Sequence, residues 1–445
     1  MATKTKKSNA GTIVIYVICA LLVLAIAYII YSNAMSRSSL FKDDMFKTVM
    51  STLLDKQPAQ VKKEDLEKVR YLSLNYTATD EDGNSALTVQ MGYDDTIEVL
   101  KKDDAESDAL GKTLKGVILD TALTDFTDLK YFTGLKALVV TSDKIKNLDF
   151  AKESKDLEYL YLTASSLEDI SKIGNFAKLT DASFNAAKIS DISAVKDCKE
   201  LTGLYLSSNA IKDASALSSL AKLKYLDISS NSELSDISAI SSLKNLEVLS
   251  LDNTAVADLA PVKELANLTQ ISFASTKVTD ISALEGKTKL TSLIANTNEI
   301  SDISALKDCK DMDSLDLGKN KITDISALSE MTKLKYCYLN DNDITDVSAL
   351  ANAKDIYVLY LTGNDNLKDT TPISELIEKS NKNDGTCYVV LPENIEIGDV
   401  EEEKTDDDEK TEETSADTQT EEKPEEETEE KPEETEENTE NTENE

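Results

Sequence analysis

Apolar residues, most of them leucine, recur with a period of 22 residues from Leu114 to about Glu378. Residues 201–213 read LTGLYLSSNAIKD, and the next copy of this pattern begins at Leu223. Twelve repeats start in this way, at Leu114, Leu135, Leu157, Leu179, Leu201, Leu223, Leu246, Leu268, Leu290, Met312, Leu334 and Ile356. Repeats of constant length bury their apolar faces by stacking on one another, so this pattern predicts a solenoid.

Within each repeat, the apolar residues at positions 1, 4 and 6 have the spacing of a short strand whose side chains point inward. Position 9 is most often asparagine, and we expect its side chain to bond backbone groups of the turn and of the neighbouring repeat. Stacked copies of this residue predict a buried asparagine ladder, made by Asn209, Asn231, Asn298, Asn320, Asn342 and Asn364.

Aspartate recurs at position 13, directly before Ile-Ser-Ala-Leu or a close variant. The column comprises Asp169, Asp191, Asp213, Asp258, Asp280, Asp302, Asp324 and Asp346, with Asp236 and Asp369 after one-residue insertions. A column of carboxylates raises the question of a metal site. However, an acceptor placed just before a short helical turn is typical of an N-cap, so we assign a capping role and no metal ligands.

Side chains at positions 2, 3, 5 and 7 face away from the core, and two groups of tyrosines stand out among them. One group comprises Tyr159, Tyr161, Tyr205 and Tyr225, and the other comprises Tyr336, Tyr338, Tyr357 and Tyr360. Tyrosine combines a large rigid contact area with a polar hydroxyl and is enriched at interfaces, although it also favours strands without any partner. These eight tyrosines are the candidate partner-binding residues. Nearby acids, namely Asp227, Asp252, Asp313 and Asp316, favour a partner with basic groups.

The N-terminal segment carries the pattern of a membrane anchor. Lysines within residues 1–11 precede an almost uninterrupted apolar run from Thr12 to Tyr31, and acids follow at Asp43 and Asp44. Twenty apolar residues in a helix span a bilayer core of about 30 Å, and the lysines place the N-terminus in the cytoplasm. Residues 12–34 therefore predict a single-pass anchor with extracytoplasmic repeats. The alternative is a signal peptide cleaved near Ala34, which yields a secreted protein.

The segments on either side of the repeats differ from them in pattern. Residues 35–113 predict a helical N-terminal cap, with a strand at residues 69–74 and an inserted hairpin around a turn at 80–84. Residues 114–378 are the repeats, and residues 379–400 predict a C-terminal cap that contains a strand at 387–391. Residues 401–445 hold 24 acids and 4 lysines, a composition typical of a disordered tail.

Composition excludes several kinds of chemistry. The chain contains no histidine, which removes the commonest general base and metal ligand, and no tryptophan. No basic stripe is present, so nucleic-acid binding is disfavoured. The repeat pattern places Cys198, Cys309 and Cys337 at apolar core positions, whereas a Cys337–Cys387 disulfide is left open by the sequence. We expect no cofactor, no catalytic residues and no enzymatic activity.

The repeat resembles the 22-residue leucine-rich repeats of the internalin class over roughly residues 40–400. This resemblance implies a curved solenoid, an α/β horseshoe with a parallel sheet on its concave face and 3-10 or short helical turns on its convex face. It also implies protein ligands on the concave face. The chain departs from the class in its N-terminal anchor, and it lacks the immunoglobulin-like module and wall-sorting tail that are often seen there, so host-cell invasion is not implied.

These observations lead to a hypothesis about function. We expect a monomeric, exported and membrane-anchored protein whose concave face binds a protein partner at the cell surface. The alternative is an envelope protein whose tyrosines bind a glycan of the cell wall while the acidic tail acts as a spacer. An enzyme that uses paired carboxylates is the third reading, but the outward aspartates are scattered and no pocket is evident from the sequence.

Overall fold

The computed structural model describes residues 40–77, 86–101, 113–119, 125–382 and 385–395 of the 445-residue chain. The predicted cytoplasmic segment (1–11), membrane segment (12–34), hairpin turn (80–84) and acidic tail (401–445) lie outside the described residues. Within the described ranges, no helix is long and apolar enough to cross a membrane. The described residues belong to one compact unit, and the fold given below is that of this unit.

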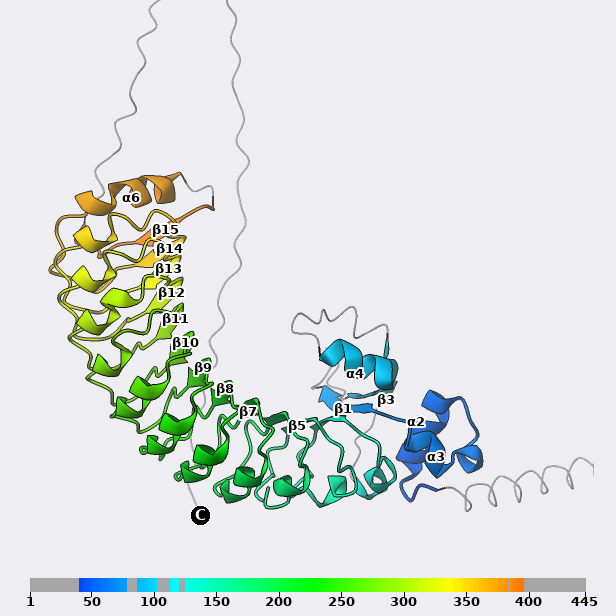
Figure 1. The fold of residues 1–445 in the computed structure, drawn as a ribbon. Coiled ribbons are helices and arrows are strands. Elements are labelled where there is room, and N and C mark those ends of the chain that lie inside the picture. The colour runs from blue at the N-terminus through cyan, green and yellow to red at the C-terminus, as the bar shows by residue number, and fades with distance from the viewer. Residues whose placement is uncertain (1–39, 78–85, 102–112, 120–124, 383–384, 396–445) are drawn as a thin grey trace, which may run out of the picture. The chain divides into compact units, whose positions relative to one another are not determined.

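One sheet of 15 strands runs through this unit, in the order β15 down to β4, then β1, β2 and β3. The strands are β1 (Tyr71–Thr77), β2 (Ala86–Gly92), β3 (Lys115–Leu119), β4 (Ala137–Thr141), β5 (Tyr159–Thr163), β6 (Asp181–Ser183), β7 (Gly203–Tyr205), β8 (Tyr225–Asp227), β9 (Val248–Ser250), β10 (Gln270–Ser272), β11 (Ser292–Ile294), β12 (Ser314–Asp316), β13 (Tyr336–Tyr338), β14 (Val358–Tyr360) and β15 (Tyr388–Val390). Strands β4 to β15 are parallel, and within this unit they line the inner side of the curved stack (Figure 1).

The outer side of the stack consists of short 3-10 helices between the strands. They are η2 (Thr127–Tyr131), η3 (Asp149–Ala151), η4 (Ile173–Asn175), η5 (Ser193–Asp197), η6 (Ser215–Ser219), η7 (Ser238–Ser242), η8 (Ala260–Glu264), η9 (Ser282–Leu284), η10 (Ser304–Asp308), η11 (Ser326–Leu328), η12 (Ser348–Leu350) and η13 (Thr371–Ile373). The apolar side chains of strands and turns meet in one continuous core, in which Leu201, Leu204 and Leu206 are completely buried. The described part of the chain is thus the predicted leucine-rich solenoid.

The position-13 aspartates accept a hydrogen bond from the first backbone amide of the 3-10 turns, from one residue before the N-cap position. Asp191 accepts a hydrogen bond from Ser193 N at 2.7 Å, and Asp302 accepts one from Ser304 N at 2.8 Å. These backbone hydrogen bonds lower the pKa of both carboxyl groups, because they stabilise the charged form. The equivalent bond is made by Asp169, Asp213, Asp236, Asp258, Asp280, Asp324, Asp346 and Asp369.

The asparagine ladder is also present. Asn342 Nδ2 donates to the carbonyl of Leu339 in its own repeat at 3.1 Å and to that of Leu317 in the preceding repeat at 3.0 Å. Its Oδ1 accepts from Ile322 N at 3.0 Å. Asn209, Asn231, Asn320 and Asn364 repeat this pattern, so each asparagine joins two repeats through their backbone groups.

The residue before the ladder position has a left-handed backbone in successive repeats. Its φ lies between 53° and 58° at Ala186, Ser208, Ser230, Asn253, Ser275, Thr297, Lys319 and Asp341, and Gly363 has φ 72°. This conformation turns the chain sharply after the strand, and the amide of Ser208 donates to the carbonyl of Ser229 in the next repeat at 3.0 Å. Eight residues other than glycine therefore have a backbone conformation that is energetically unfavourable for L-amino acids.

The N-terminal end of the sheet differs from the sequence prediction. The repeat predicted to start at Leu114 is not a member of the parallel stack, because β3 pairs antiparallel with β2 at the edge of the sheet. The parallel neighbour of β4 is β1, with Leu72 opposite Leu138, and β1 forms the expected hairpin with β2. The spacing of Leu114, Val117 and Leu119 mimics a repeat strand. The sequence predicts that β3 lies beside β4 in the parallel sheet, but β1 occupies that position.

Four helices flank this end or precede it: α2 (Asp44–Leu54), η1 (Pro58–Gln60), α3 (Lys63–Leu66) and α4 (Asp94–Leu100). The apolar face of α2 is buried, and the ring of Phe46 packs 5.8 Å from that of Phe132. Asp43 caps the helix by accepting from Phe46 N at 2.8 Å. Helix α2 is therefore amphipathic, and its apolar face is joined to the core of the first parallel repeats.

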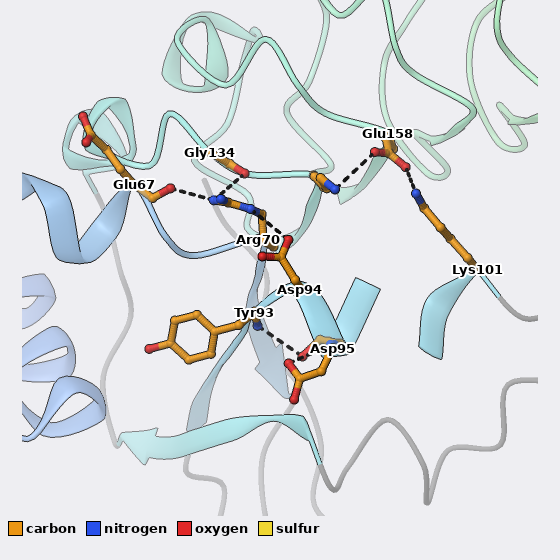
Figure 2. A network of polar contacts seen from close by, with 10 residues as sticks. Glu67, Arg70, Tyr93, Asp94, Asp95, Lys101, Gly134 and Glu158 are labelled. Carbon is orange, nitrogen blue, oxygen red and sulfur yellow. Dashed lines mark hydrogen bonds and ion pairs between the residues drawn. The ribbon is translucent and has the colours of Figure 1, made fainter. Parts of the chain in front are cut away.

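A polar network ties the inserted hairpin to the repeats (Figure 2). Arg70 donates through Nη1 to the carbonyl of Glu67 at 2.6 Å and to that of Gly134 at 3.3 Å, and its Nε lies 3.2 Å from Asp94. Lys101 forms an ion pair with Glu158 at 3.0 Å. A Cβ at position 134 would lie 2.1 Å from the carbonyl oxygen of Glu67, so glycine is required for this close approach.

The C-terminal end follows the prediction more closely. Helix α6 (Ser374–Asn381) follows η13, and β15 extends the parallel sheet by pairing with β14. Cys198, Cys309 and Cys337 are buried thiols outside any disulfide, so the Cys337–Cys387 disulfide does not form. Burial raises the pKa of Cys337 to about 12.

Candidate binding surface

The inner face of the sheet carries columns of outward side chains in register. One column runs through Val139, Tyr161, Ser183, Tyr205, Asp227, Ser250, Ser272, Ile294, Asp316, Tyr338, Tyr360 and Val390. The column two residues earlier contains Tyr159, Tyr225, Tyr336 and Tyr388. Because adjacent strands lie about 4.8 Å apart, tyrosines on neighbouring strands of one column are close enough for ring contact.

The C-terminal tyrosine patch comprises Tyr336, Tyr338, Tyr357, Tyr360 and Tyr388. The rings of Tyr338 and Tyr360 stack with centroids 5.4 Å apart, while Tyr357 makes edge contacts with Tyr336 at 6.0 Å and with Tyr388 at 5.6 Å. Tyr336, Tyr357, Tyr360 and Tyr388 are 37–45% exposed. The structure therefore brings all four tyrosines predicted for this region onto one face of the sheet, as the stacked pair Tyr338–Tyr360 and a group of three around Tyr357.

Tyr388 is a member that the sequence analysis missed. It lies beyond the last regular repeat, separated from Tyr360 by helix α6, and the 22-residue period does not reach it. Its exposed fraction of 45% is the highest among the large hydrophobic side chains of the described residues. The strand predicted at 387–391 could have indicated this residue, because a strand that extends the parallel sheet places one of its side chains in the tyrosine column.

The N-terminal group is more enclosed. Tyr159, Tyr161 and Tyr205 are half-buried around Asp181 on β6, and only Tyr225 is well exposed, at 39%. Burial raises the pKa of Tyr161, and the nearby charge of Asp181 adds to this shift. Burial also raises the pKa of Asp181. These tyrosines thus surround a partly desolvated carboxyl group and present less ring surface than the C-terminal patch.

Glycine at position 203 is a condition for this arrangement. A Cβ on Gly203 would lie 2.5 Å from Asp181 Oδ1 and 3.2 Å from the ring of Tyr205. The space beside β7 is therefore filled by side chains from both sides. We expect any larger residue at this position to displace Asp181 or Tyr205.

The acids between the two groups are engaged in hydrogen bonds within their own or a neighbouring repeat. Asp227 accepts from Ser229 N at 3.0 Å and from Ser229 Oγ at 2.6 Å. Asp252 accepts from Ala274 N at 2.6 Å, and burial raises its pKa. Asp316 accepts from Gly318 N at 3.1 Å and from Asn296 Nδ2. These bonds hold the carboxyl groups in place, and Asp316, which pairs with Tyr338 on the adjacent strand, lies next to the C-terminal patch.

The side chains of this face provide hydrogen-bonding groups and apolar ring surface. Within the described ranges, no group of three His, Cys, Asp or Glu side chains is placed to hold a metal ion. The tyrosine hydroxyls and fixed carboxylates offer hydrogen bonds, and the rings offer apolar area. Desolvation raises the pKa of Tyr338, and neighbouring Tyr360 and Asp316 add to the shift, so its hydroxyl stays neutral and able to donate at physiological pH.

Comparisons with known proteins identify the repeat. Residues 199–242, 221–267 and 288–330 match the family described as leucine-rich repeats (2 copies). No curated protein sequence matches the chain. An internalin structure from Listeria monocytogenes is similar over 67% of this chain and 93% of its own, with 24% identity and a TM-score of 0.52, which shows that the fold is shared.

Two further structures show smaller likenesses. Internalin C2 from Listeria monocytogenes is 32% identical over 40% of this chain and 79% of its own, with a TM-score of 0.39. A leucine-rich-repeat protein from Leptospira interrogans is 18% identical over 60% of this chain and 74% of its own, with a TM-score of 0.49.

Proposed function

Because the chain is an internalin-like leucine-rich-repeat protein, we propose that it binds a protein partner through the concave face of its sheet. The C-terminal tyrosine patch supplies the main contact area in this proposal, and Tyr225 with its neighbours supplies a second contact. The protein is exported and held at the outer side of the membrane by residues 12–31, so the partner lies at the cell surface.

The observation that carries this proposal is the exposure of four tyrosines, Tyr336, Tyr357, Tyr360 and Tyr388, each in ring contact with another tyrosine of the sheet. Leaving large aromatic rings 37–45% exposed forfeits the stabilisation that their burial provides, which a protein partner restores. Tyrosine anchors of this kind dominate binding energy at interfaces. The sheet beneath is joined by the asparagine ladder, so the patch is formed before binding and little ordering cost is added.

The ring geometry favours a protein over a sugar as the partner. A sugar ring stacks on an open aromatic face, but Tyr338 and Tyr360 cover one face of each other with an interplanar angle of 25°. The edge contacts of Tyr357 with Tyr336 and Tyr388 turn the rings into an uneven surface with several hydroxyls. Asp316 beside Tyr338 favours a lysine or arginine of the partner at this point.

Site-specific photo-crosslinking on intact cells tests the binding face. A photoreactive amino acid replaces Tyr360 in one variant and Lys307, an exposed residue on the outer side, in a matched control. We expect one dominant protein adduct at position 360 and none at 307. Equal adducts at both positions, or adducts with wall polysaccharide only, would contradict a protein partner on the concave face.

The cellular location is tested separately. A peptide tag is placed after Glu445, intact cells are treated with protease, and membrane and medium fractions are blotted. We expect a membrane-bound tagged band that the protease removes. A tagged band found only in the medium would show that the chain is cleaved near Ala34 and secreted, and would contradict the anchor. A membrane-bound band that resists protease even after wall removal would overturn the surface location.

A further inference from the structure

Lysines gather around a hollow at the opposite side of the first repeats, away from the tyrosines. This lysine pocket has a volume of about 550 Å³ and is formed by Lys42, the turns η2 and η3, and the loop between β4 and η3. The residues lining it are Lys42, Asp125, Phe126, Thr127, Lys130, Lys144, Ile145, Lys146, Asn147, Asp149, Phe150 and Lys152. Five lysines and two aspartates give it a positive charge in a chain whose net charge is −36.

Most of these lysines form no ion pair. Several lysines of later repeats pair with an acid of a neighbouring repeat, as Lys222 does with Glu200 at 2.5 Å and Lys321 with Glu299 at 3.0 Å. In the pocket, Lys144 pairs with Asp143 at 3.1 Å, and Lys130 lies 4.8 Å over the ring of Tyr131. Among the described residues, Lys42, Lys130, Lys146 and Lys152 have no acid within 4 Å.

The repeat that starts at Leu135 has asparagine instead of aspartate at position 13, so one negative charge is absent here. Position 13 of this repeat is Asn147, whose Oδ1 accepts from Asp149 N at 3.1 Å, as the aspartates do in later repeats. The amide therefore caps the turn but carries no charge. Among the nearby acids, Asp125 accepts from Thr127 N at 2.8 Å. Buried Asp128 accepts through Oδ2 from Lys42 N at 2.8 Å and Asp43 N at 3.0 Å.

From this geometry we propose that the lysine pocket binds a phosphate-bearing anion. Lysine acts as a point charge with three rotatable donors, which suits the many oxygens of a phosphate, whereas planar carboxylates are matched best by arginine, and no arginine lines the pocket. The packed rings of Phe126 and Phe150, 5.9 Å apart, form an apolar part of the lining. The phosphate belongs either to a lipid headgroup or to a soluble phosphate compound.

Calorimetric titration of the full chain in neutral detergent with sodium tripolyphosphate tests the site. We expect one saturable site at low ionic strength and about fivefold weaker binding for each lysine removed, so about 25-fold for Lys146→Gln with Lys152→Gln. The variant Asn147→Asp keeps the cap found in the other repeats but adds a charge, and it weakens binding about fivefold. The matched control is Lys307→Gln, which leaves the affinity unchanged.

Protection of Lys146 and Lys152 from acetylation identifies the source of the phosphate. Protection in nanodiscs of phosphatidylglycerol, but not of phosphatidylcholine, identifies lipid headgroups. Protection only on addition of tripolyphosphate identifies a soluble ligand. Absence of protection in both cases, or unchanged affinity in Asn147→Asp and the double lysine variant, would overturn the site. Either failure leaves the concave-face proposal intact, because the two surfaces share no residue.

Discussion

The asparagine ladder allows a quantitative test of how neighbouring repeats are coupled. Asn342 is 5% exposed and joins two repeats, and Asn364 in the next repeat is completely buried. The carbonyl of Leu339 accepts from both side chains, at 3.1 Å from Asn342 and at 3.0 Å from Asn364. The substitution Asn342→Ala therefore leaves this carbonyl with one donor, whereas the double substitution with Asn364→Ala leaves it with none.

The expected cost follows from counting the backbone groups affected. In Asn342→Ala, the amide of Ile322 loses its bond to Asn342 Oδ1, and the carbonyls of Leu317, Leu339 and Asn340 each lose one of two bonds. A buried hydrogen bond contributes about 1 kcal/mol and a fully orphaned group costs about 1–3 kcal/mol, so the single variant loses about 4 kcal/mol of unfolding free energy. In the double variant, the orphaned Leu339 carbonyl adds a coupling of about 1 kcal/mol.

Urea unfolding followed by circular dichroism gives these free energies. The control pair is Asn342→Ala with Asn209→Ala, whose side chains share no carbonyl, and its two costs should add. A cost below about 1 kcal/mol for Asn342→Ala would refute the count of buried bonds. Equal coupling in the adjacent and the distant pair would refute the shared-carbonyl explanation.

Three further predictions concern the repeat framework. The thiols of Cys198, Cys309 and Cys337 should resist alkylation in the folded protein and react on unfolding, because burial raises their pKa to about 12, 11 and 12; rapid labelling of the native chain would contradict this. Substitution of the β-branched, left-handed Thr297 by Asn should raise the unfolding free energy by about 1 kcal/mol, and a loss of stability in urea would argue against strain there. The lowered pKa of Asp302 and Asp324 means that their contribution is present above the ordinary carboxyl pKa and is lost as pH falls through the folded value. Replacing both by Asn, which caps the turn as Asn147 does, should reduce the acid sensitivity of the melting temperature, and an unchanged pH profile would refute the assignment.

Most of the framework could be predicted from the sequence, because period and side-chain type determine it directly. The inward leucines, the asparagine ladder and the capping aspartates occupy equivalent positions in the structure, and their roles depend on contacts that repeat with the period. The register of the outward tyrosines follows from the same period, since strands of equal spacing pair residue by residue.

The remaining features depend on contacts that break the period. Strand β3 has the spacing of a repeat, but its pairing is decided by β1 and β2, which lie outside the repeats. The left-handed column has no compositional signature, since it contains Ala186, Ser208 and Lys319 alike. Tyr388 joins its patch across α6, and the lysine pocket depends on Lys42, which belongs to no repeat.

The most direct test of the concave-face proposal is the affinity of the partner recovered by crosslinking for chains that differ only in the C-terminal tyrosine patch. We expect Tyr338→Ala with Tyr360→Ala to weaken binding at least about 30-fold, because two aromatic anchors are lost at about 1–2 kcal/mol each. The convex control Lys307→Gln should bind as the unaltered chain does. Unchanged affinity in the tyrosine double variant, with its unfolding free energy preserved, would contradict the central claim that this patch binds the partner.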